Sequence, residues 1–257
     1  MTNCDRQHEI AIWCGPMTLL DARSVLAVQP HYDDNDIGAA GTLTLLARAG
    51  AVITYVTVTD DLAGVLDADL PDDVARRHLL AEQREAGAIV GVRDHVDLEW
   101  PDAAGLDHIA LRDQIIDLIR DTRPDLVLTV DPWLPHEAHS DHTITGRAVS
   151  EAIILSGLPR VRRSTGAAAV AVPRIGYYFT AEANQVTDTS AVQRERHATL
   201  DCYRSQFTEQ DLVGLHQVID RYERAQAPTG ASHGERLKVL PVSALHVGLA
   251  LPRPPAN

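Results

Sequence analysis

A cluster of ionisable residues, Pro30-His31-Tyr32-Asp33-Asp34, stands directly after a mostly apolar run, Ser24–Gln29. The run predicts a buried strand over residues 24–30, and the small residues that follow predict a turn into a helix over 38–50. Ionisable side chains are costly in a core, but they are useful at the carboxyl edge of an α/β sheet, where ligands bind. A second cluster, His139-Ser140-Asp141-His142, follows another apolar strand. The two clusters favour a fold that brings two strand ends together.

Strand and helix patterns alternate along the first 160 residues. After the segments above, strands and helices follow in turn over residues 51–59, 72–90, 95–100, 107–122, 126–130 and 140–155. Asp72 and Ser140 are the expected N-caps of two of these helices, and Gly91 is the expected C-terminal stop of one. The order predicts an α/β protein with a Rossmann-like, mostly parallel sheet flanked by helices.

The pattern loosens beyond residue 160. We expect a strand over 174–180, helices over 190–204 and 208–225, and a mobile Pro-rich tail at 251–255. Residues 1–257 are therefore expected to form a single domain. Its core covers about residues 24–160, and a smaller C-terminal α+β extension covers about 161–250.

Composition narrows the class of partner and the compartment. The formal charge of −13 disfavours nucleic acid and anionic membrane surfaces, because both select basic patches. No apolar run is long enough to insert in a membrane and the N-terminus lacks a signal pattern, so we expect a cytoplasmic protein. The three cysteines form no CxxC pair, which argues against a disulfide framework. No GxGxxG follows the first strand, which disfavours a dinucleotide-binding oxidoreductase.

The two ionisable clusters contain the donors of a catalytic zinc site, which uses three protein ligands and keeps one position open. His31 and Asp34 can point at one ion from a turn, and a histidine of the second cluster can complete the set. Asp33 is then a neighbouring carboxylate that can take a proton from water whose pKa the metal has lowered. His139 and His142 lie one helical turn apart, and their spacing alone does not choose the ligand.

The remaining residues of the second cluster can assist the reaction. A protonated His139 could stabilise an oxyanion and protonate a leaving amine, and Asp141 could accept a hydrogen bond from it. His136 is expected at the rim of the site. The acidic run Asp67–Asp73 is most simply a solvated loop, with a mobile lid as the alternative.

These motifs resemble the signature of the LmbE-like (PIG-L) N-acetylglucosaminyl deacetylases, PHPDDE followed by a glycine-rich GGT turn. The resemblance covers about residues 24–207 and includes Arg123–Thr129, Asp131-Pro132 and Ser205-Gln206. It implies a Zn²⁺ ion, or another divalent metal, held by His31, Asp34 and His142. It also implies Asp33 as general base, and His139 with Asp141 as its partner at the tetrahedral intermediate.

Three positions depart from the family signature. Tyr32 replaces the usual Pro, Asn35 the usual Glu, and Leu79 an Arg that many sugar deacetylases carry three residues before the Glu matching Glu82. We expect the Tyr32 hydroxyl to lie near the mouth and contact substrate. We expect Arg77, or Arg76, to substitute for the missing arginine.

The resemblance implies hydrolysis of an N-acyl, most simply N-acetyl, amide of an amino sugar or sugar conjugate. Asp102 matches a position that often contacts substrate. The expected partner is a small N-acylated molecule, and the expected assembly is a homo-oligomer. The alternatives are an amidase of another N-acyl conjugate and a non-catalytic binding protein that retains the metal.

Overall fold

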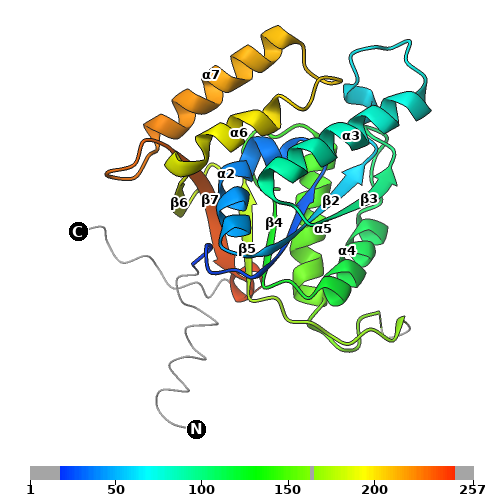
Figure 1. Cartoon of the computed structure of the whole chain (residues 1–257). Coiled ribbons are helices and arrows are strands. Elements are labelled where there is room, and N and C mark those ends of the chain that lie inside the picture. The colour runs from blue at the N-terminus through cyan, green and yellow to red at the C-terminus, as the bar shows by residue number, and fades with distance from the viewer. Residues whose placement is uncertain (1–17, 163–164, 247–257) are drawn as a thin grey trace.

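The computed structural model describes residues 18–162 and 165–246 of the chain (Figure 1). A seven-stranded sheet runs through it in the order β3-β2-β1-β4-β5-β7-β6. The strands are β1 (Ser24–Gln29), β2 (Val52–Thr59), β3 (Asp94–Trp100), β4 (Leu126–Val130), β5 (Arg174–Tyr178), β6 (Gln185–Asp188) and β7 (Gly234–Pro241). Strands β1 to β5 pair in parallel, whereas β7 pairs antiparallel with both β5 and β6.

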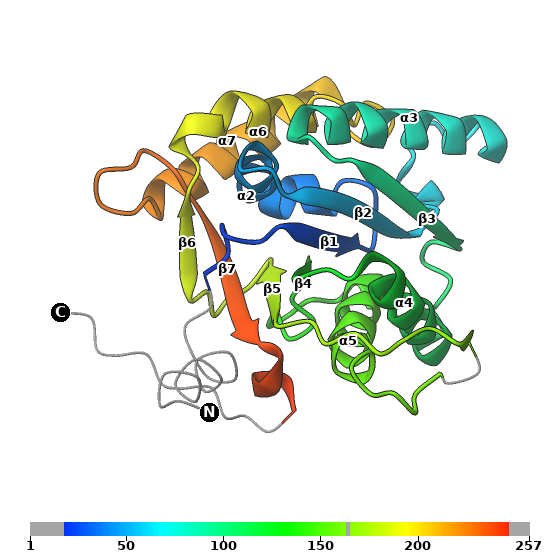
Figure 2. The same cartoon turned by 60° about the horizontal axis from the view of Figure 1, so that its bottom comes forward.

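Helices cover both faces of the sheet (Figure 2). They are α2 (Asp34–Arg48), α3 (Asp72–Val90), α4 (His108–Thr122), α5 (Ser140–Leu155), α6 (Gln193–Leu200) and α7 (Glu209–Ala225). Helices α2, α3, α6 and α7 lie on one face, and α4 and α5 lie on the other. Each face has its own apolar core, with Leu43 and Leu46 of α2 in one and Ile115, Ile116 and Ile119 of α4 in the other.

The predicted Rossmann-like, mostly parallel sheet is confirmed, and the C-terminal residues extend the same sheet. Strands β6 and β7 were not predicted. Helix α2 begins at Asp34 instead of residue 38, because the amides of Asp36 and Ile37 already donate to the Asp33 carbonyl at 3.0 and 2.8 Å.

The helix ends also test the sequence. Gly91 ends α3 in the left-handed conformation, with φ of 95°, as predicted. The predicted N-caps Asp72 and Ser140 were wrong by one residue, since Pro71 and His139 occupy those positions. The Pro-rich segment 251–255 lies outside the described residues. No helix in the described ranges is both long and apolar enough to cross a bilayer.

The strand order creates a crevice between β1 and β4. The chain proceeds from β1 to β2 and β3 on one side, and returns to β4 on the other side of β1. The loops that leave the carboxyl ends of β1 and β4 therefore diverge, and open α/β sheets bind ligands at such a point. Both ionisable clusters follow these two strands.

A buried ion cluster joins the C-terminal extension to α2. The Arg196 side chain of α6 is 2% exposed and lies 3.0 Å from Glu223 and 3.1 Å from Glu235. Its guanidinium also donates to the carbonyls of Asp36 and Ile37 in the first turn of α2. The Glu235 carboxylate accepts hydrogen bonds from two α2 amides, those of Gly41 and Thr42, each at 2.7 Å.

Removing the Arg196 charge should destabilise the fold. Arg196→Met leaves two buried carboxylates without their cation, and breaking a buried pair in this way costs about 3–5 kcal/mol. Urea unfolding of the variant measures the loss. Arg194→Met, at an exposed position of the same helix, is the control and should change the free energy of unfolding by about 0.5 kcal/mol or less. Equal stability of the two variants would contradict the role given to Arg196.

Candidate metal and active site

The turn after β1 is held by a buried glutamine. The Gln29 side-chain amide donates to the Tyr32 carbonyl at 3.1 Å, and its Oε1 accepts from the Asn35 amide at 2.8 Å. The Asn35 side chain donates to the carbonyl of Ala27 at 3.2 Å. These bonds tie the strand, the turn and the first turn of α2 together, so the side chains of the turn are presented in fixed directions.

Hydrogen bonds from two buried tyrosines also support this turn. The Tyr203 hydroxyl donates to the Tyr32 carbonyl at 2.9 Å and also to the Asp36 carboxylate, which accepts from Tyr55 at 2.9 Å. Burial raises the pKa of Asp36 to about 6, although both tyrosine hydrogen bonds and Arg196 act to lower it. The chain after α6 thus contacts the turn that carries His31 and Asp34 directly.

Three predicted ligands converge at the crevice. His31 Nδ1 lies 3.3 Å from one Asp34 oxygen, and His142 Nε2 lies 3.4 Å from the other. Donor atoms of these three residues all lie within 4.8 Å of one another. Two nitrogens and one carboxylate oxygen at this separation match the donor set of a divalent transition metal. His31 also belongs to two overlapping donor groups, one with His139 and Asp141 and one with Asp61 and Asp102.

The electrostatics around His31 favour a cation. Burial lowers the pKa of His31, but its hydrogen bonds to Asp102 and Asp34 outweigh burial and raise the pKa to about 11. Burial likewise acts to raise the pKa of Asp102, and the bond to His31 lowers it overall. A carboxylate-rich pocket that stabilises positive charge this strongly fits a bound metal ion.

His31, Asp34 and His142 line a hollow of about 350 Å³. Asp33 lies in it with an exposure of only 8%. Burial, followed by the neighbouring charges of Asp34 and Asp61, raises the pKa of Asp33 well above its ordinary value. A carboxylate with a raised pKa is a stronger base, which suits proton abstraction at this position.

His139 reaches the hollow from the N-cap of α5. Its ring centroid lies 4.7 Å from that of His31 and 5.3 Å from that of His142. The backbone N–H of Asp141 donates to His139 Nδ1 at 3.3 Å, which assigns the remaining ring proton of a neutral imidazole to Nε2.

The expected hydrogen bond from His139 to the Asp141 carboxylate is absent. Asp141 is fully buried, and its carboxylate accepts a hydrogen bond from the Ala103 amide at 3.0 Å. Its Oδ2 atom lies 4.0 Å from His31 Nε2. Because α5 begins at Ser140, the helix turns this side chain inward, toward the loop that follows β3.

The expected substrate contact of Tyr32 was wrong. Its side chain is 0% exposed and packs in an apolar cluster with Leu79, Ala86, Cys202 and Tyr203. The pleat and turn after β1 point it away from the hollow and beneath α3.

The other predicted contact residues differ in position. Asp102 lines the hollow, whereas His136 is exposed and lies outside it. Arg77 was wrong as a site residue, because its side chain is 63% exposed and pairs with Asp73 one helical turn earlier. Arg76 instead pairs with Asp60 at 3.2 Å, and the Asp60 carboxylate also accepts a hydrogen bond from the Asp102 amide.

Two polar residues of the hollow, Asp61 and Gln206, were not predicted as site residues. Asp61 is 2% exposed, accepts from the Tyr32 amide at 3.0 Å, and accepts from the Gln206 side chain at 2.9 Å. Burial raises the pKa of Asp61 to about 7. The pair Asp60-Asp61 stands directly after β2, so the same strand-end argument could have found Asp61. Gln206 comes from the chain after α6; the segment Ser205-Gln206 carries part of the family resemblance, but no strand-end pattern marks it as a site residue.

Comparisons with known proteins agree with this geometry. The family model PIG-L, described as GlcNAc-PI de-N-acetylase, matches residues 26–153. A diacetylchitobiose deacetylase of Thermococcus kodakarensis is 30% identical over 235 residues, which cover 88% of this chain and 86% of the relative.

Solved structures share the fold. The N,N'-diacetylchitobiose deacetylase of Pyrococcus horikoshii superposes with a TM-score of 0.81 at 25% identity, covering 96% of each chain. A 4-carboxy-2-hydroxymuconate hydratase, GalB of Pseudomonas putida, has a TM-score of 0.73 at 17% identity, covering 91% of this chain and 99% of its own. The second likeness concerns the fold alone. The extent of the match to the Thermococcus protein and the family model show that the chain belongs to the PIG-L (LmbE-like) family.

Proposed function

We propose that the protein is a zinc-dependent hydrolase that removes the acetyl group from an N-acetylated amino sugar or sugar conjugate. The observation that carries the proposal is one hollow lined by three convergent metal donors together with a buried carboxylate and a further histidine. In the proposal, His31, Asp34 and His142 hold the metal. When bound, a divalent ion there supplies Lewis-acid polarisation of the amide carbonyl and lowers the pKa of water.

Asp33 moves the proton in this scheme. It takes a proton from the attacking water and returns it to the amine nitrogen as the C–N bond breaks, so the products are a free amine and acetic acid, which ionises to acetate. His139 donates a hydrogen bond from Nε2 to the oxyanion that forms on the former carbonyl. Asp102, 3.3 Å from His31 Nε2, orients that ring, and an Asp141 oxygen lies 4.0 Å from the same nitrogen.

The relatives support the choice of substrate class. The Thermococcus and Pyrococcus proteins are both named as deacetylases of diacetylchitobiose, an N-acetylated disaccharide. A Bacillus cereus relative, 30% identical over 213 residues, is named as a probable deacetylase of N-acetylglucosaminyl malate. A cytoplasmic location and a homo-oligomeric assembly stay predictions.

Neutralising the base should separate metal binding from turnover. Asp33→Asn keeps the volume and the three ligands but cannot accept the proton, so kcat for amine release from an N-acetylated sugar should fall by about 100-fold or more. Elemental analysis should still find the metal. Asp121→Asn, an exposed carboxylate of α4, is the control and should retain full activity. Normal turnover in Asp33→Asn would exclude Asp33 as the base.

Removing a ligand or the metal should affect stability as well as activity. A chelator should abolish amine release and lower the melting temperature, because an ion present at 100 times its Kd stabilises the folded state by about 2.7 kcal/mol. His142→Ala should purify without stoichiometric metal. Its melting temperature should then be insensitive to the chelator, which is the matched control. Activity that survives complete metal removal would refute the metal-dependent mechanism.

A further inference from the structure

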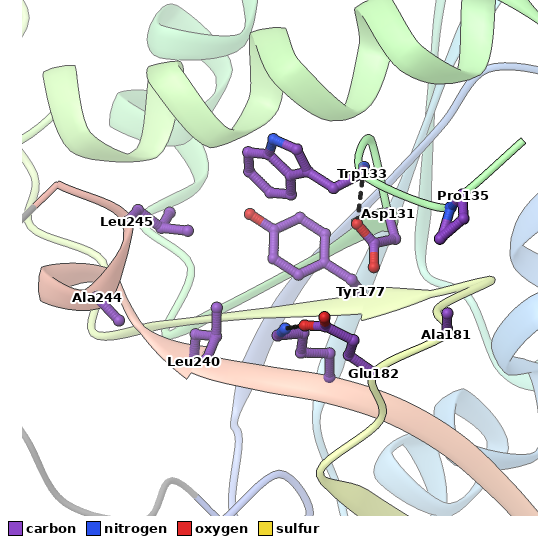
Figure 3. Close-up of a pocket in the computed structure, with 10 residues that line it drawn as sticks. Asp131, Trp133, Pro135, Tyr177, Ala181, Glu182, Leu240, Ala244 and Leu245 are labelled. Atoms are coloured by element: carbon purple, nitrogen blue, oxygen red, sulfur yellow. Dashed lines mark hydrogen bonds and ion pairs between the residues drawn. The ribbon is translucent and has the colours of Figure 1, made fainter. Parts of the chain in front are cut away.

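A second cavity lies beside the loop that follows β4 (Figure 3). It measures about 290 Å³, and its walls come from β5, β7, the segment 131–135 and the 3-10 helix η4 (Val242–Leu245). None of its lining residues lines the candidate metal site. The proposed reaction therefore leaves this cavity without a role.

An aromatic platform forms one side of the cavity. The Trp133 residue is 55% exposed, and its ring meets Tyr177 edge to face, with centroids 5.7 Å apart and an interplanar angle of 80°. The Tyr177 hydroxyl is bonded to Ser150 at 2.7 Å, and the Asp131 carboxylate accepts from the Trp133 amide at 2.9 Å. These bonds fix the Tyr177 ring and the Trp133 backbone.

Polar groups of both signs line the same cavity. Asp131 is 7% exposed, and Lys238 of β7 pairs with Glu182. Leu240 and Leu245 complete the apolar wall. Carboxylates accept hydrogen bonds from hydroxyls and an ammonium group donates to them, so the cavity offers both kinds of partner to a polyhydroxylated ligand.

This combination excludes several other ligands. A phosphate or carboxylate ligand would be repelled by the Asp131 and Glu182 carboxylates, and Lys238 already pairs with Glu182. A fatty acyl chain would remove the Asp131 carboxylate and the Lys238–Glu182 pair from water without adding a hydrogen-bond partner, which is unfavourable. A neutral pyranose satisfies both halves of the cavity, since its C–H face covers an indole and its hydroxyls reach the charged groups.

The cavity and the metal site share two segments of chain. Pro135 lines the cavity, and His139, four residues later, lines the metal site. Phe179 stacks on His142 with centroids 6.2 Å apart, and Ala181, two residues later, lines the cavity. Short segments that leave the carboxyl ends of β4 and β5 therefore connect the two sites.

We infer that the Trp133 cavity binds a sugar ring of the substrate other than the one that loses its acetyl group. The identity of the substrate in this inference rests on the proposed function. The cavity then makes the protein selective for saccharides of two or more units over a single N-acetylated sugar.

The first experiment compares N,N'-diacetylchitobiose with N-acetylglucosamine as substrates. Trp133→Ala should lower the ratio of their kcat/KM values by about tenfold, the loss expected when an aromatic contact is truncated. Trp133→Phe keeps an aromatic face and should retain most of the ratio. Tyr222→Ala removes a comparably exposed aromatic from α7 and should leave the ratio unchanged.

The second experiment measures binding without turnover. Lys238 is the only lysine in the sequence, so its acetylation by N-hydroxysuccinimidyl acetate can be followed by peptide mass spectrometry. In the Asp33→Asn background, saturating diacetylchitobiose should slow the acetylation of Lys238, and adding Trp133→Ala should remove this protection.

The two experiments keep the inference apart from the proposed function. If no N-acetylated sugar is hydrolysed but the disaccharide protects Lys238 through Trp133, the function fails and the sugar site stands. If hydrolysis occurs but Trp133→Ala changes neither the ratio of kcat/KM values nor the protection of Lys238, the sugar site is overturned. If Lys238 reactivity falls as the protein concentration rises, with no sugar present, a second copy of the chain covers the cavity. This result would also overturn the inferred sugar site.

Discussion

The buried contact between Arg196 and the start of α2 is the interaction on which the site depends. Carbonyls of Asp36 and Ile37 and amides of Gly41 and Thr42 are bonded to an arginine and a glutamate from the C-terminal extension. The turn that carries the metal donors immediately precedes this stretch. The family model ends at residue 153, yet the geometry of its first motif is held by residues some forty to eighty positions further on.

Local patterns in the sequence predicted most of the fold because β1, β2 and β4 are mostly apolar runs and β3 alternates polar and apolar residues, with helices between the strands. The exceptions have a physical reason. Strands β6 and β7 read Gln185–Asp188 and Gly234–Pro241, and their polar positions resemble loop sequence. They become strands because β7 pairs with the open edge of β5 and β6 then pairs with β7, and β7 is distant in the chain from both of these strands.

The candidate site also contains residues that the sequence predicted and contacts that it did not. His31, Asp33, Asp34, His139 and His142 are found in sequence because each follows a buried strand or begins the next helix. The partner of Asp141 could not be found, because the orientation of its side chain depends on how α5 meets the loop after β3. Contacts that join loops distant in sequence, such as Gln206 with Asp61, leave no periodic or spacing signal.

Position 32 shows how the family signature can change without moving the metal donors. Its amide and carbonyl hold the turn through Asp61, Gln29 and Tyr203, so the backbone alone serves the site. The tyrosine side chain instead fills space beneath α3 against Leu79. Two of the three departures from the signature, those at 32 and 79, therefore belong to one apolar cluster. A change of side-chain size at either position is then a change in core packing beneath α3, while the backbone of the turn keeps its hydrogen bonds.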